Sequence, residues 1–131
     1  MYFVETGEKR IYQFDFDPEV GEISNRSVLV QLDATAGEPD GLCVDSKGNI
    51  WVALFDAGRL NRYRDNGILD RTLPMPVRRP TSCCLGGVAL DTLYITSAKI
   101  GHSPGEDDSM GAGGLWAVEV ECPGRPENEF G

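Results

Sequence analysis

The residue best suited to chemistry in this sequence is Asp40, which lies between Pro39 and Gly41. A carboxylate can bind a hard divalent cation, and it can accept a proton from an attacking water molecule. A glycine beside it would let the backbone approach another chain segment closely. Pro-Asp-Gly is also a common turn sequence, so Asp40 could equally be an ordinary turn residue.

Asp40 stands at the entrance of a predicted β-hairpin. Leu42 to Val44 and Ile50 to Leu54 are the two strand-like runs. The residues between them favour a tight turn, because Gly48 can take a positive φ and Asp45 can hydrogen-bond its own backbone. We therefore expect this hairpin to hold Asp40 at the mouth of a site.

The remaining reactive side chains are few and do not form a motif. The cysteines Cys43, Cys83, Cys84 and Cys122 lack the spacing of a zinc site, and the first three lie in apolar strand-like runs. We interpret them as buried reduced thiols, which fits a reducing cytoplasm. His102 is the single histidine and lies in a polar loop, and no Gly-x-Ser-x-Gly sequence accompanies it, so no serine-hydrolase triad is indicated.

Composition narrows the possible classes of protein. The chain has 131 residues, of which 40% are hydrophobic, enough for one small domain with a core. Its formal net charge of −9 makes nucleic acid and anionic membrane surfaces poor partners. No apolar run approaches the roughly 20 residues of a transmembrane helix, so we expect no membrane association.

Hydrophobic patterning predicts an all-β protein without a convincing amphipathic helix. The expected strands cover residues 2–4, 11–16, 27–32, 42–44, 50–54, 59–64, 69–73, 82–85, 93–96 and 115–120.

These strands recur in a regular order. Residues 1–3, 50–52 and 93–95 share a strand motif at offsets of 49 and 43 residues, from Met1 to Ile50 and from Ile50 to Leu93. A period of about 40–50 residues with four strands per unit is typical of a β-propeller blade. A β-sandwich also has short strands, but it does not predict this ordered recurrence.

The repeat divides the chain into a partial blade over 1–33, a complete blade over 39–75 and a partial blade over 80–121. The expected strands number three, four and three, or about two and a half blades of antiparallel sheet. Closed propellers typically need four to eight blades. We therefore expect either a part of a longer protein or copies that associate through open propeller edges into a homo-oligomer.

The repeat also indicates which residues share the face of Asp40. Thr81 and Ser82 follow Pro80 as Asp40 and Gly41 follow Pro39, so we expect them to line the central channel. Ordinary strand-start residues would fit the same positions. The loop over 99–113 is a candidate lid or a solvated acidic loop, and it carries His102, Glu106, Asp107 and Asp108.

Two long motifs make the sequence similar to a known family. They are the runs 39–45 with 48–53 and 79–87 with 91–98, and the shorter runs 14–17, 21–26 and 113–116 agree with them. Together they resemble the SMP-30/gluconolactonase/regucalcin family. The resemblance implies a six-bladed β-propeller about twice this length. The present chain would be its C-terminal half, because residues 124–131 resemble the family's end, and Met1 would be an internal methionine or a fragment boundary.

The resemblance further implies a function. Family members hydrolyse sugar lactones such as gluconolactone to aldonic acids, using one divalent metal ion in the central channel. The metal is held by a Glu, an Asn and the Asp of the Pro-Asp-Gly motif, and only the Asp maps onto this chain, as Asp40. The Glu and the Asn would precede Met1, so the chain alone would lack a complete catalytic site. We therefore expect Asp40 to be a metal ligand and catalytic base, with Ca²⁺, Zn²⁺, Mn²⁺ or Mg²⁺ as the metal.

Two other functions are compatible with the sequence. The chain could be a non-catalytic half-propeller module that self-associates or binds calcium. It could also belong to a propeller hydrolase for another ester class, such as an organophosphatase or a luciferin-regenerating relative.

Overall fold

The computed structural model describes residues 1–100 and 111–126. Ten strands and no helix lie within these two ranges, which confirms the predicted all-β class. The strands are β1 (Tyr2–Glu5), β2 (Arg10–Asp17), β3 (Glu22–Gln31), β4 (Glu38–Val44), β5 (Ile50–Phe55), β6 (Arg59–Tyr63), β7 (Leu69–Pro74), β8 (Pro80–Gly86), β9 (Thr92–Ser97) and β10 (Leu115–Glu119).

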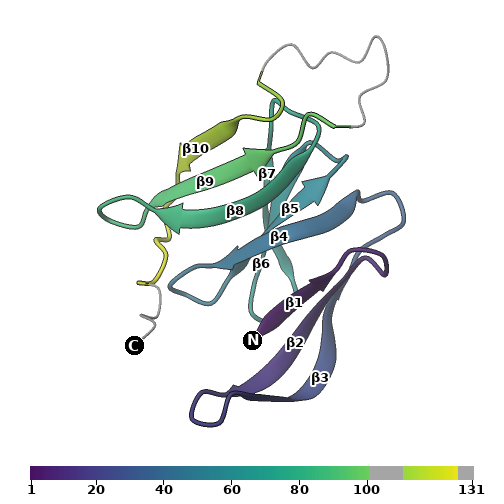
Figure 1. The fold of residues 1–131 in the computed structure, drawn as a ribbon, viewed down its shortest axis with the longest axis vertical. Coiled ribbons are helices and arrows are strands. Elements are labelled where there is room, and N and C mark those ends of the chain that lie inside the picture. The colour runs from purple at the N-terminus through teal and green to yellow at the C-terminus, as the bar shows by residue number, and fades with distance from the viewer. Residues whose placement is uncertain (101–110, 127–131) are drawn as a thin grey trace.

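The strands form three antiparallel sheets that succeed one another along the chain (Figure 1). The first sheet has the order β1-β2-β3, the middle sheet β4-β5-β6-β7 and the last sheet β10-β9-β8. Each sheet is a meander of sequential neighbours. β4 and β8, the first strands of the middle and last sheets, lie close to each other.

Strand β5 explains why the sheets pack face to face. Its residues alternate between two buried faces, because successive side chains of a strand point to opposite sides. Val52 and Leu54 join the core shared with the first sheet, whereas Trp51 and Ala53 join the core shared with the last sheet. A strand buried on both faces therefore holds the three sheets together.

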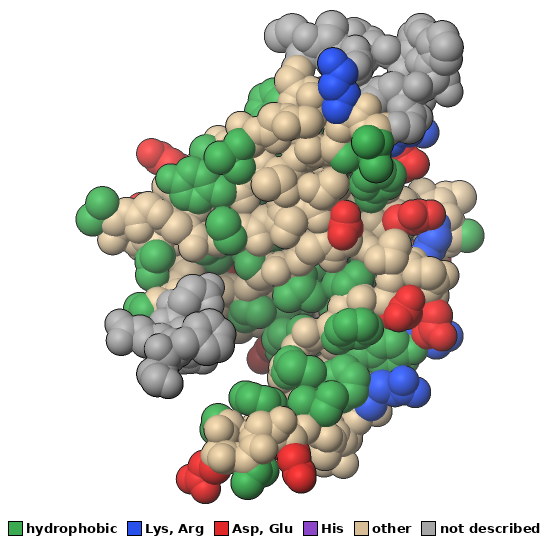
Figure 2. Space-filling model, viewed as in Figure 1, with side chains coloured by type: hydrophobic (Ala, Val, Ile, Leu, Met, Phe, Trp, Pro, Cys, Tyr) green, Lys and Arg blue, Asp and Glu red, His purple; other side chains and the backbone are tan. Residues whose placement is uncertain are grey.

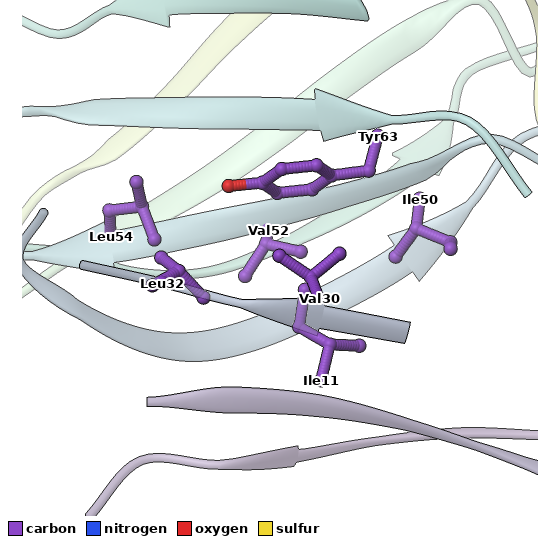
Figure 3. Packing of buried hydrophobic residues seen from close by; sticks show 7 residues of the cluster. All are labelled: Ile11, Val30, Leu32, Ile50, Val52, Leu54 and Tyr63. Carbon is purple, nitrogen blue, oxygen red and sulfur yellow. The ribbon is translucent and has the colours of Figure 1, made fainter. Parts of the chain in front are cut away.

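Figure 3 shows the first of these two cores. Ile11 of β2 and Val30 of β3 point toward Ile50 and Val52 of β5, and the ring of Tyr63 lies beside them. The second core contains Trp51, Ala53, Leu60, Cys83, Leu93 and Ile95.

The predicted turn between β4 and β5 is confirmed, with Asp45 at its centre. The Asp45 side chain is fully buried, and its Oδ1 accepts hydrogen bonds from the backbone N–H groups of Lys47 and Asn49, each at 2.9 Å. Gly48 has a φ of 84°, as a turn of this kind requires. The hairpin that carries Asp40 is thus fixed by its own sequence.

Two strands begin earlier than the sequence predicts. β3 begins at Glu22 instead of residue 27, because Asp17 to Asp15 continue the pairing with Glu22 to Ser24. β4 begins at Glu38 instead of residue 42, so Pro39 is buried inside a strand. The expectation that Asp40 precedes the hairpin is therefore wrong: Asp40 lies within β4.

The prediction that the cysteines are buried is only partly correct. All four are free thiols. Cys83 and Cys122 are buried and Cys43 is half-buried, but Cys84 is exposed. The reason is strand alternation in β8: Cys83 faces the middle sheet, and its neighbour faces the other side.

No membrane-spanning helix is found in residues 1–100 and 111–126. The residues named for the candidate lid, His102, Glu106, Asp107 and Asp108, lie outside the described ranges.

Candidate functional site

Asp40 lies in a bulge of β4. Pro39 pairs with Leu54 and Leu42 pairs with Val52, so Asp40 and Gly41 together face a single residue of β5. Proline lacks a backbone N–H and cannot donate to the ladder, which favours an irregularity after it. The bulge takes Asp40 out of the regular pairing of the two strands.

The Asp40 side chain is half-buried and has no ion-pair partner among residues 1–100 and 111–126. Burial raises the pKa of the Asp40 carboxyl above its usual range, and a hydrogen bond with the Gly41 backbone offsets part of this effect. An unpaired, partly desolvated carboxylate is able to take up a cation or a proton. A metal ligand needs the first of these properties, and a catalytic base needs the second.

Gly41 marks the point where β4 and β8 meet. A Cβ atom added at Gly41 would lie 2.2 Å from Ser82 Oγ and 2.7 Å from Ser82 Cα. Only a residue without a side chain allows this approach, as the sequence suggested for Gly41. The structure thereby brings Ser82 next to the residue that follows Asp40.

Thr81 occupies the equivalent bulge of β8. Pro80 pairs with Ser97 and Ser82 with Thr96, which leaves Thr81 as the extra residue. The hydroxyl groups of Thr81 and Thr96 are hydrogen-bonded at 2.8 Å. The segments that follow Pro39 and Pro80 are therefore structurally equivalent, as the sequence repeat suggested. The bulge that both segments share was not predicted from the repeat.

Two turns contact the starts of these strands. Thr6, in the turn after β1, donates its hydroxyl hydrogen bond to the carbonyl oxygen of Pro39 at 2.9 Å. Asp56, in the turn after β5, accepts a hydrogen bond of 2.6 Å from Nε of Arg79, the residue before Pro80. Each turn therefore tethers the segment that leads into one bulge.

The Arg79–Asp56 pair is a feature that the sequence analysis missed. The Arg79 side chain is 7% exposed, and its guanidinium lies 5.6 Å from the centre of the Phe55 ring. Asp56 has a φ of 62°, which is uncommon for a residue other than glycine. No local pattern in the sequence signals that Arg79 is buried, because its partner is 23 residues away.

The described residues supply part of a metal site at most. Carboxylate and hydroxyl oxygens are donors that Ca²⁺, Mg²⁺ and Mn²⁺ accept, and Asp40 fits such a cation as one charged ligand. No group of three His, Cys, Asp or Glu residues with the arrangement of a metal site is present in the part of the chain that the structure describes. Further ligands would have to come from other segments.

The sequence matches proteins with assigned names over most of its length. The pentonolactonase XacC of Haloferax volcanii is 39% identical over 131 residues, which cover 96% of this chain and 45% of that protein. Regucalcin of Danio rerio is 40% identical over 101 residues, which cover 76% of this chain and 34% of that protein. The chain spans less than half the length of these relatives.

The fold is also similar to a solved structure. A calcium-binding protein, regucalcin, from Agrobacterium tumefaciens superposes with a TM-score of 0.83 and 26% identity, over 95% of this chain and 43% of that one. The sequence model of the SMP-30/gluconolactonase/LRE-like region matches residues 1–99. The chain belongs to the SMP-30/gluconolactonase/LRE-like family.

Proposed function

We propose that this chain is part of a six-bladed β-propeller that hydrolyses sugar lactones to aldonic acids with one divalent metal ion. The three sheets would be successive blades, over 1–33, 39–75 and 80–121. The lactonase name of the Haloferax volcanii relative supports the reaction class. The calcium-binding regucalcin from Agrobacterium tumefaciens supports a divalent cation.

A single observation carries the proposed role of Asp40. Its carboxylate is half-buried and unpaired, among the described residues, at the place where β4 meets β8. Structural carboxylates in this chain have partners instead: Asp45 caps a turn, and Asp70 binds Arg62. A carboxylate held in a strand bulge without an ion-pair partner among the described residues is available to a ligand.

The chemistry of a lactone fits these groups. A lactone is a cyclic ester, and its hydrolysis needs a polarised carbonyl, an activated water and a stabilised oxyanion. A bound divalent cation supplies the polarisation and lowers the pKa of its water. Asp40 would hold the cation and accept the proton of the attacking water. Ser82 and Thr81 would place hydroxyl groups beside the sugar ring.

Lactone hydrolysis by a complete propeller that contains this chain tests this proposal. Protein freed of metal with a chelator is assayed on gluconolactone and on a pentonolactone, with Ca²⁺, Mn²⁺, Zn²⁺ or Mg²⁺ added back. We expect metal-dependent activity that Asp40→Ala lowers by about 10²-fold or more, the usual contribution of a general base. Asp33→Ala is the matched control, because Asp33 is an exposed carboxylate of the preceding loop. Equal activity of wild type and Asp40→Ala would remove Asp40 from the mechanism.

A second candidate function is a non-catalytic module that self-associates or binds calcium. Strand edges and apolar side chains support it: Phe3 of β1 is 50% exposed and Leu115 of β10 is 68% exposed. Hydrophobic side chains also gather where the first sheet meets the middle sheet (Figure 2). A sedimentation experiment that finds only monomer, together with lactone hydrolysis, would contradict this candidate.

We further propose a cytoplasmic location. The four cysteines are free in the structure, as expected for a reducing compartment.

A further inference from the structure

Cys43 and Cys83 bring two thiols together across the contact between β4 and β8. Their Sγ atoms are 3.6 Å apart, although the residues are 40 positions apart in the chain. Both are free cysteines, one half-buried and the other buried.

The contact is supported by the main chain as well as by the side chains. The backbone of Cys43 hydrogen-bonds the thiol of Cys83, and the Cys83 thiol donates to the carbonyl oxygen of Trp51 at 3.7 Å. Gly41 and Ser82, close to the two cysteines in their strands, are already in direct contact. The two strands therefore lie close enough for side-chain rotation to join the sulfurs, whose bonded distance is about 2.0 Å.

A cavity of about 450 Å³ gives small molecules access to the pair. Its lining includes Cys43, Cys83, Cys84 and Arg125. A volume of this size admits a peroxide. The described residues offer no third ligand beside the two thiols, which disfavours a metal site here.

We propose that Cys43 and Cys83 are an oxidation site that a peroxide converts to an intramolecular disulfide. The Cys43 thiolate attacks one peroxide oxygen, the O–O bond breaks, and Cys43 becomes a sulfenic acid. The Cys83 sulfur then attacks the sulfur of Cys43, and the hydroxyl group leaves with the Cys83 proton as water. Two thiols are oxidised, one hydrogen peroxide is reduced, and two waters form.

The roles of the two residues follow from their surroundings. Contact with the Cys43 thiol and burial raise the pKa of Cys83 well above its usual value, so Cys83 stays protonated. Half-buried Cys43 is the more accessible of the two and reacts first. The disulfide would join the strand that carries Asp40 to the strand that carries Ser82.

Thiol counting and peptide mapping after treatment with dilute hydrogen peroxide test this proposal. The wild-type chain should fall from four titratable thiols to two, and a non-reducing digest should contain a Cys43–Cys83 peptide. Reduction with dithiothreitol should restore all four. Cys122→Ser and Cys84→Ser should still lose two thiols, whereas Cys43→Ser and Cys83→Ser should not form the linked peptide.

The wild-type map decides the question even if a variant fails to fold. Cys84 is the competing target because it is exposed. A map in which Cys84 is oxidised while Cys43 and Cys83 remain free thiols would overturn the proposal, as would a Cys83–Cys84 disulfide.

Discussion

At the scale of the residue, Asp40 combines a functional advantage with a cost in stability. Its carboxylate is partly desolvated and has no compensating charge among the described residues. Burial of an uncompensated charge disfavours the ionised form in the folded protein. This loss of stability is compatible with a cation site, because a carboxylate already paired with an arginine would bind a metal ion less readily.

The first prediction concerns the stability of Asp40→Asn as a function of pH. The pKa of Asp40 is raised in the folded state, so its contribution to stability is present at acidic pH and is lost as the pH rises through the folded pKa. Asp40→Asn removes the charge, and it should be more stable than wild type at neutral pH without metal. The difference should vanish only below the ordinary pKa of an unfolded aspartate, where Asp40 is protonated in both the folded and the unfolded state.

Urea unfolding of both proteins across the acidic and neutral range measures this effect. Asp33→Asn serves as the control, because an exposed carboxylate should show little difference at any pH. A wild type that is more stable than Asp40→Asn at neutral pH would show that Asp40 has a stabilising partner.

At the scale of the element, the contact between β4 and β8 depends on Gly41. Any side chain there would meet Ser82, including its backbone at 2.7 Å, and backbone cannot move aside as a flexible side chain can. The two bulges place Asp40 and Thr81 beside this contact. The geometry of the candidate site thus rests on one small residue.

Gly41→Ala tests this dependence. We expect a loss of about 1–3 kcal/mol in the free energy of unfolding, the usual cost of overpacking. Gly7→Ala is the matched control: its added Cβ would lie 3.6 Å from the nearest atom, a Glu5 side-chain oxygen, and the change should stay within about 0.5 kcal/mol. Urea denaturation gives both values. Equal stability of the two variants would contradict this dependence, because it would mean that β4 and β8 move apart at Gly41 at little energetic cost.

The sequence predicted every strand of the described ranges, because hydrophobic alternation and turn residues are local signals. It placed the start of β4 too late, since Pro39 and Gly41 indicate a turn, whereas pairing with β5 extends the strand through a bulge. The burial of Cys84 was also predicted wrongly, because Cys84 is exposed. Which side of β8 is covered depends on the arrangement of the sheets and not on the apolar run itself.

The candidate site was predictable only in part, for a similar reason. The repeat related Asp40 to Thr81, and both lie in equivalent bulges. The contacts of Arg79 with Asp56 and of Cys43 with Cys83 join residues 23 and 40 positions apart. Such pairs arise from the packing of sheets, which no local pattern records.

At the scale of the whole molecule, the sheets leave apolar surface and strand edges accessible. β1 is an edge strand of the first sheet, and the exposed side chain of Phe3 lies on it. Exposed edges of this kind are ready sites for pairing with another chain. We therefore expect the chain to associate with further copies of itself in solution.

Phe3→Glu should weaken this association by placing a charge on the edge strand. Sedimentation velocity at several concentrations should show a dimer or larger species for wild type and a shift toward monomer for the variant. Val20→Glu is the control for added charge, because Val20 is 67% exposed in the turn between β2 and β3. A concentration-independent monomer for wild type would contradict the expected association.

If Asp40 is a ligand of a divalent cation, its replacement should weaken Mn²⁺ binding. Binding is followed by electron paramagnetic resonance at neutral pH for wild type, Asp40→Asn and Asp33→Asn, each in the assembly that sedimentation finds. We expect a loss of affinity of about tenfold or more for Asp40→Asn, because a charged ligand is removed, and unchanged affinity for Asp33→Asn. Equal affinity of all three proteins would contradict this expectation.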